Sequence, residues 1–139
     1  MRTRSGERFS KTVRITADEV TRFAHASGDD NPIHHDAGYA RTTRIGRVIA
    51  SGAHTSSLLM AHTAAHFSRS GPMLGLDFSF RFKRPVFVDQ EVRMDWLVVG
   101  VRSSTRLRGD VVDLRGRMVS ECGTTVVGAR GRVLLKDSL

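Results

Sequence analysis

The chain has 139 residues, of which 40% are apolar and 26% charged, a composition typical of a globular protein and not of a disordered one. The length predicts one domain, and the single cysteine excludes an internal disulfide and a cysteine-rich zinc site. No apolar run approaches the roughly 20 residues that cross a bilayer. The first seven residues are charged with no apolar stretch behind them, so we expect a cytoplasmic protein without a secretory signal.

The formal net charge is +8, and the basic residues are 19 arginines and 3 lysines. A surface of this charge attracts nucleic acid, acidic proteins and phosphorylated small molecules. The arginines are scattered along the sequence, however, and aromatic residues are not interleaved with them. The sequence has no helix-turn-helix, zinc-finger or RRM pattern. We therefore expect no nucleic-acid partner.

The first elements of the chain are short. Residues 8–15 alternate apolar and polar side chains, which predicts a strand. Residues 16–19 have the spacing of a capping box and predict the start of a helix, which the glycine and proline within 28–32 end. Asp36 predicts the start of a further short helix over residues 37–42.

A long helix and a sheet follow. Residues 49–67 are rich in Ala, Leu and Met, and Ser51 is a suitable N-cap, so we expect a largely buried helix of about 16 residues. The remainder is rich in valine, with period-two alternation and glycine punctuation, which predicts four antiparallel strands. Helix and strands together predict an α+β fold in which a sheet curls around the helix. The expected strands span residues 76–82, 91–101, 105–119 and 124–135.

The densest functional signal lies in residues 27–36. Asp29 and His34 flank a turn at Asn31-Pro32, and a turn can bring their side chains together. A carboxylate and an imidazole in this arrangement can hold one water and move its proton. The alternative is that Asp29 and Asn31 only cap turns and that the histidine lies on the surface.

This segment resembles the signature of the MaoC-like hydratases, the (R)-specific enoyl-CoA hydratase or hydratase-2 family. The signature is a small residue, Gly, Asp, any residue, Asn, Pro, an aliphatic residue and His, and residues 27–34 match it in full. The resemblance continues in Ile49-Ala-Ser-Gly at 49–52, and in the Phe-x-Phe, Pro-Val and Asp-x-x-Val run within 78–92. It implies a hot-dog fold and the addition of water to the 2,3 double bond of an enoyl thioester, or the reverse dehydration.

The resemblance also implies roles for individual residues. Asp29 and His34 would be the catalytic pair, and Gly52 would bind the thioester carbonyl through its backbone N–H at the start of the long helix. Asn31 would shape the turn that holds the pair. Ser51 stands where the family often has histidine, and we expect it to affect the pocket wall and substrate choice. The thioester itself acidifies the α-carbon, so we expect no metal and no other cofactor.

The resemblance further predicts the organisation of the protein. Residues 1–7 would be a flexible N-terminus, and residues 8–139 a single MaoC-like hot-dog domain. Two subunits of this fold usually pair edge to edge, which predicts a homodimer. The substrate would be an acyl thioester of coenzyme A or of a carrier protein, with no membrane partner.

Several weaker signals have simple structural alternatives. His54 lies just past Gly52 and can line the pocket mouth. His62 and His66 have i,i+4 spacing on the long helix, but no third ligand is evident, so we favour a structural role over a metal site. The remaining candidates are basic residues that either bind phosphates of the substrate or form a solvated surface: Arg41, Arg44, Arg47, Arg81, Lys83 and Arg84.

Two other functions compete with hydration. One is a hot-dog thioesterase, which places its carboxylate differently, and the intact signature argues against it. The other is a non-catalytic subunit that binds acyl chains. Such a subunit would be expected to lose the Asp or His of the signature, and both are present at Asp29 and His34.

Overall fold

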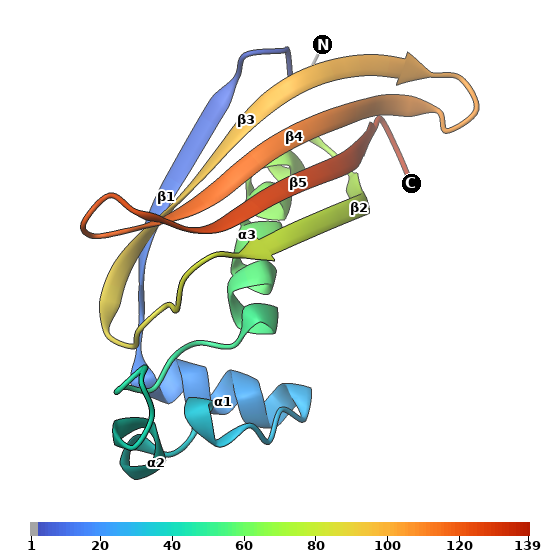
Figure 1. Cartoon of the computed structure of the whole chain (residues 1–139). Helices are drawn as coiled ribbons and strands as arrows, with labels where there is room; N and C mark the ends of the chain where they lie inside the picture. The colour runs from blue at the N-terminus through green and yellow to red at the C-terminus, as the bar shows by residue number, and fades with distance from the viewer. Residues whose placement is uncertain (1–2) are drawn as a thin grey trace.

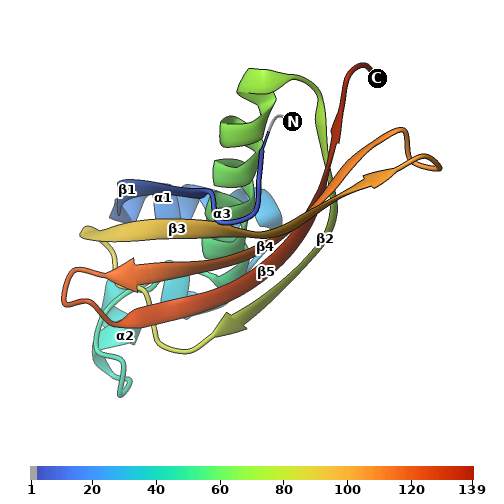
Figure 2. The ribbon, with the colours of Figure 1, turned by 90° about the horizontal axis from the view of Figure 1, so that it is seen from above.

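The computed structural model describes residues 3–139 and consists of a five-stranded antiparallel sheet curled around a central helix (Figures 1 and 2). The sheet has the strand order β1-β3-β4-β5-β2. The expected α+β hot-dog fold is confirmed. The elements are β1 (Arg8–Ile15), α1 (Ala17–Ser27), η1 (Pro32–His34), α2 (Ala37–Arg41), α3 (Gly52–Phe67), η2 (Ser68–Ser70), β2 (Met73–Phe82), β3 (Gln90–Ser104), β4 (Gly109–Ser120) and β5 (Thr125–Lys136).

The three expected helix N-caps are confirmed. Thr16 Oγ1 accepts a hydrogen bond from the N–H of Glu19 at 3.2 Å, and Asp36 Oδ1 accepts one from the N–H of Tyr39 at 3.0 Å. Ser51 Oγ accepts the N–H of His54 at 3.1 Å, so α3 begins at the residue that the sequence indicated. These side chains satisfy donors that the first helical turn leaves free.

Three strand bounds differ from the expectation by more than one residue: β2 begins at Met73 and not at 76, β3 ends at Ser104 and not at 101, and β4 begins at Gly109 and not at 105. Residues 105–108 form the turn between β3 and β4, although the sequence predicted a strand from residue 105. The reason lies just before Gly100, where the pairing of β3 with β4 shifts register between Val98 and Gly100 and leaves Val99 unpaired. Val99 is the extra residue of a bulge and Gly100 stays paired with Asp113, so β3 continues to Ser104 and the turn comes later.

The inner face of the sheet packs on α3 and forms the core. Alternate residues of β3 point inward, and Trp96 among them is almost fully buried. The Trp96 Nε1–H donates a hydrogen bond to the carbonyl of Leu59 on α3 at 3.1 Å. In Figure 1, α1 and α2 lie at the N-terminal end of α3, which brings the segment between them to the start of that helix.

The segment before β1 runs along β3. The N–H of Gly6 donates to the carbonyl of Val98 at 2.8 Å, and Glu7 contacts His66 Nε2 at 2.9 Å. Residues 1 and 2 lie outside the described part of the chain, and the flexibility expected for residues 1–7 stays a prediction. Within residues 3–139, no helix is both long and apolar enough to cross a membrane.

Candidate active site

The candidate site begins where α1 ends. Gly28 adopts a left-handed conformation, φ 76°, that a side chain would strain. The N–H groups of Gly28 and Asp29 bond back to the carbonyls of His25 and Ala24, at 3.1 and 2.8 Å. This is the common glycine termination of a helix, and it turns the chain sharply so that Asp29 follows directly on the end of α1.

Asn31 then shapes the turn between Asp29 and His34. Asp29 Oδ1 accepts the N–H of Asn31 at 3.0 Å, and Asn31 Oδ1 accepts the N–H of Ile33 at 3.3 Å. Pro32 occupies the first position of η1, where the lack of an N–H costs nothing. Two successive turns, each closed by a side-chain oxygen that accepts a backbone N–H, therefore reverse the chain within residues 29–34.

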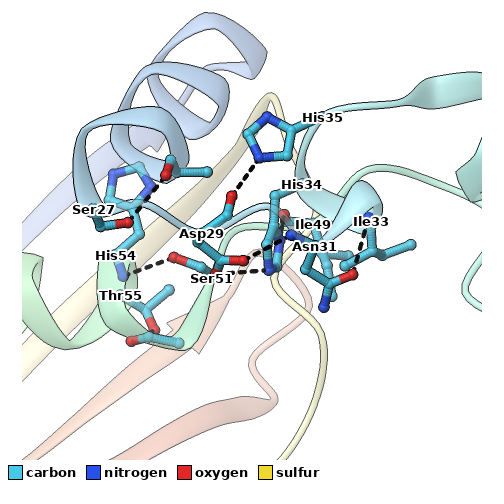
Figure 3. A network of polar contacts seen from close by, with 12 residues as sticks. Ser27, Asp29, Asn31, Ile33, His34, His35, Ile49, Ser51, His54 and Thr55 are labelled. Carbon is cyan, nitrogen blue, oxygen red and sulfur yellow. Dashed lines mark hydrogen bonds and ion pairs between the residues drawn. The ribbon is translucent and has the colours of Figure 1, made fainter.

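The reversal brings Asp29 and His34 together (Figure 3). His34 Nε2 lies 3.5 Å from Asp29 Oδ2. This distance is longer than a good hydrogen bond, so the two atoms face each other without being tightly joined. The His34 side chain is 8% exposed and that of Asp29 is 32% exposed. The pair thus combines a buried imidazole with a carboxylate that water can reach.

The other ring nitrogen of His34 fixes the orientation of the imidazole. His34 Nδ1 lies 2.8 Å from the carbonyl oxygen of Ile49. A carbonyl can only accept, so Nδ1 carries the proton and donates it. The Nε2 atom is then the one that exchanges protons, and it points at Asp29. The N–H of Ile49 also bonds to the carbonyl of Ile33 at 3.2 Å, which holds η1 against the segment before α3.

The N-terminus of α3 lies beside this pair. Ser51 caps the N–H of His54 and its carbonyl accepts the N–H of Thr55. The N–H of Gly52 has no hydrogen-bond acceptor among the residues that the structure describes. A cavity of about 370 Å³ opens here. Its walls come from η1, the segment before α3, the first turn of α3, the end of β2, the loop after it and β5: His34, Ile49, Ala50, Gly52, Thr55, Phe82, Lys83, Arg84, Pro85, Val86 and Val127.

Phe82 covers the start of α3 at the mouth of this cavity. A Cβ placed on Gly52 would lie 3.0–3.2 Å from three carbons of the Phe82 ring. The ring is the last side chain of β2 and is 57% exposed. Glycine at position 52 therefore leaves room for an aromatic ring that belongs to a distant strand.

His54 does not lie at the pocket mouth where the sequence placed it. It is buried, and its ring stacks on Phe23 of α1 with centroids 4.5 Å apart. Burial lowers the pKa of His54, an effect that Glu19 partly opposes. The cause is helical phase: residues two positions apart on a helix point to different sides, so His54 turns away from the cavity that Gly52 lines.

Three groups at the site were not predicted from the sequence. Thr55 lines the cavity because it lies three positions after Gly52 on the same face of α3, a spacing that the sequence does show. The carbonyl of Ile49 and the ring of Phe82 carry no sequence signal of their own. His35 also has a role that the sequence did not predict. Its Nε2 lies 2.6 Å from the backbone oxygen of Asp29, and this contact helps to hold the turn between Asp29 and His34 (Figure 3).

The Ser51 cap gives a direct test of how much this helix start contributes to stability. Ser51→Ala removes the acceptor of the His54 N–H and leaves the backbone in place. We expect a loss of about 1 kcal/mol in the free energy of unfolding and a small effect on turnover. Urea titration of both proteins measures the difference. A Ser51→Ala protein that is as stable as the wild type but inactive would show that Ser51 takes part in catalysis and does not only cap the helix.

Comparison with known proteins identifies the family. Residues 3–115 match the model of the MaoC-like domain. The chain is 31% identical over 130 residues to the (R)-specific enoyl-CoA hydratase of Aeromonas caviae, a match that covers 94% of this chain and 93% of the relative. It is 34% identical over 102 residues to 3-hydroxyacyl-thioester dehydratase Z of Mycobacterium tuberculosis, covering 70% and 68% of the two chains.

A solved structure shares the whole fold. The (R)-hydratase from A. caviae involved in PHA biosynthesis superimposes with a TM-score of 0.86 at 30% sequence identity. The superposition covers 96% of this chain and 97% of that one. The resemblance seen in three short segments of the sequence therefore extends over nearly the entire structure.

Proposed function

Because the chain belongs to the MaoC-like domain family, we propose that it is a hydro-lyase that adds water to the 2,3 double bond of an enoyl thioester, or removes it from a 3-hydroxyacyl thioester. The observation that carries this proposal is the facing pair of Asp29 and His34 at 3.5 Å, with the His34 ring anchored on Ile49. The pair stands beside the free N–H at the start of α3. Relatives that match most of the chain are named as a hydratase and a dehydratase.

The pair can hold and activate the water. Asp29 and protonated His34 share one transferable proton. Asp29 takes a proton from the water as the hydroxyl group bonds to C3, and His34 Nε2 gives a proton to C2. The proton on Asp29 then passes to His34 Nε2, 3.5 Å away, which restores the starting protonation states. The hydrogen on His34 Nδ1 stays on that nitrogen and remains hydrogen-bonded to the Ile49 carbonyl, so the ring does not turn during the cycle.

Gly52 supplies the second component, which is stabilisation of the thioester carbonyl. Negative charge develops on that oxygen as the hydroxyl adds to C3. The unpaired N–H of Gly52 and the positive end of the 16-residue helix α3 can both stabilise this charge. The reaction needs no metal or redox group, because the thioester itself acidifies the α-carbon.

The hydratase can be separated from its two alternatives in one assay with crotonyl-CoA. Loss of the enoyl absorbance without release of free thiol indicates hydration. Release of thiol indicates a thioesterase. Binding without either change indicates a non-catalytic acyl-binding subunit and would contradict the proposal. The proposed substrate is an acyl thioester of coenzyme A or of a carrier protein in the cytoplasm.

We predict that the protein is a homodimer with a continuous sheet. Strand β2 is at the edge of the sheet and has exposed Leu74 and Leu76. Within one copy, α3 also exposes Met60 and small residues on the side away from the sheet. A free edge and an apolar helix face would favour aggregation in a monomer. Sedimentation that shows only a 15.4 kDa species at micromolar concentration would contradict this prediction.

A further inference from the structure

The outer face of the sheet, opposite α3, gathers arginines that the sequence scatters. Strand alternation points Arg115 and Arg117 of β4 outward, and likewise Arg130 and Arg132 of β5. Arg81 of β2 lies two strands away in the same row as Arg117, with Gly128 between them. No basic stripe is visible in the sequence, because these residues become neighbours only through strand pairing.

Part of this charge is neutralised locally. Arg93 and Arg117 both bond to Asp95, at 2.9 and 3.1 Å. Arg132 bonds to Asp113 at 2.7 Å. These carboxylates are therefore occupied and are not available to the remaining cations.

Four of the remaining cations lie together over β4, β5 and the end of β2: Arg81, Lys83, Arg115 and Arg130, which we call the outer basic surface. None of the four forms an ion pair with a carboxylate in the described part of the chain. Arg115 and Arg130 are direct cross-strand partners, an arrangement that is destabilising for like charges. All four line one shallow hollow of about 550 Å³, whose floor includes Gly128. The surface therefore carries unpaired positive charge around a shallow, open hollow.

The outer basic surface reaches the candidate active site. Strand β2 ends at Phe82, and Lys83, the next residue, lines both the outer hollow and the cavity that contains His34 and Gly52. An anion bound on the surface would thus lie at the edge of the cavity, one residue from the ring that covers Gly52.

We propose that this surface docks the acidic face of a carrier protein that delivers the acyl group on a phosphopantetheine arm. The proposal rests on the proposed function, since it names the carrier of that thioester. The cations are exposed and spread over β4, β5 and β2, a span of about 10 Å at the usual strand spacing. A phosphate group is better held by convergent donors, whereas separated cations on a broad face complement an acidic protein surface.

The observations favour a protein over a nucleic acid. Single strands bind where bases can stack on aromatic side chains. The aromatic side chain that lines the hollow, Phe80 of β2, is half-buried against the core, and the exposed ring of Phe82 lies over Gly52. The four cations are therefore not interleaved with freely exposed rings along the hollow, an arrangement that suits carboxylates on a folded partner better than stacked bases.

The test uses the double variant Arg115→Glu/Arg130→Glu, which changes neither the catalytic pair nor the cavity. The substrates are crotonyl-CoA and the same acyl group on a bacterial acyl carrier protein. We expect kcat/KM for the carrier-bound substrate to fall about tenfold or more, through KM, while the value for crotonyl-CoA changes less than about twofold. The wild-type value for the carrier-bound substrate should also fall steeply with added salt.

The matched control is Arg102→Glu/Arg106→Glu, the same charge change at the exposed far end of β3 and its turn. We expect it to leave both substrates nearly unchanged. An equal loss with crotonyl-CoA and the carrier-bound substrate in the Arg115/Arg130 variant would overturn the proposal in favour of coenzyme phosphates. No loss with either substrate would overturn it as well.

A binding measurement separates this proposal from the proposed function. Calorimetry with the unacylated carrier protein tests docking even if the wild type hydrates neither substrate, a result that would refute only the hydratase. A wild-type protein that neither binds nor uses the carrier refutes the docking surface. Loss of binding to a single-stranded oligonucleotide in the variant, with carrier binding intact, would assign the surface to nucleic acid instead.

Discussion

Asp29→Asn and His34→Ala are each expected to lower kcat by about two to four orders of magnitude, the usual contribution of a positioned acid–base group. Asparagine cannot take the proton of the water, and alanine removes the Nε2 that faces Asp29 at 3.5 Å. The double variant should be little worse than either single variant, because the two residues act as one unit. Initial rates with crotonyl-CoA measure all three, with melting temperatures to confirm folding.

The matched controls are the neighbouring residues of the same types. Asp30 is exposed, and Asp30→Asn should leave kcat within about threefold of the wild type, as a surface substitution away from the chemistry should. His35 holds the backbone oxygen of Asp29 at 2.6 Å, so His35→Ala should cost more than Asp30→Asn but far less than His34→Ala. A His35→Ala loss as large as that of His34→Ala would show that the catalytic histidine has been assigned to the wrong position.

The features that the sequence predicted are those set by neighbours along the chain. The helix N-caps at Thr16, Asp36 and Ser51 depend on hydrogen bonds between residues three positions apart in the sequence. All three hydrogen bonds form. The turn that joins Asp29 to His34 is closed within six residues, so its geometry also follows from local sequence. Hydrophobic alternation located the strands for the same reason.

The features that the sequence missed depend on tertiary contacts. Strand β3 continues past the bulge at Val99, because a glycine such as Gly100 can either end a strand or, as here, remain paired next to a bulge. The Ile49 carbonyl and the Phe82 ring reach the site from segments that pack against it only in the folded chain. The unpaired cations at Arg115 and Arg130 become neighbours only through the register of β4 and β5.

Gly52→Val is expected to abolish hydration while the protein stays folded. The proposed functional group at position 52 is the backbone N–H, which no side-chain deletion can remove. The test therefore adds a bulkier side chain that blocks the approach of the thioester to this N–H. We expect a loss larger than the roughly 10²–10³-fold that removal of one oxyanion donor costs. The residue lies in the first turn of α3, where valine is tolerated locally. Turnover of a short and a long enoyl-CoA measures the effect, with melting temperatures alongside.

The contact with Phe82 offers a second explanation for an inactive Gly52→Val protein, namely a collision with the ring and not the blocked Gly52 N–H. A double variant separates these two explanations. The valine would also collide with the Phe82 ring, which lies 3.0–3.2 Å from where a Cβ on Gly52 would stand. Phe82→Ala removes that collision, and alone it should keep hydration while changing KM more for one acyl length than for the other. If the Gly52 N–H polarises the carbonyl, Gly52→Val/Phe82→Ala stays inactive, because the valine still shields the amide. Recovery of activity in the double variant would show that glycine serves only to accommodate the ring, and the oxyanion assignment would then be wrong.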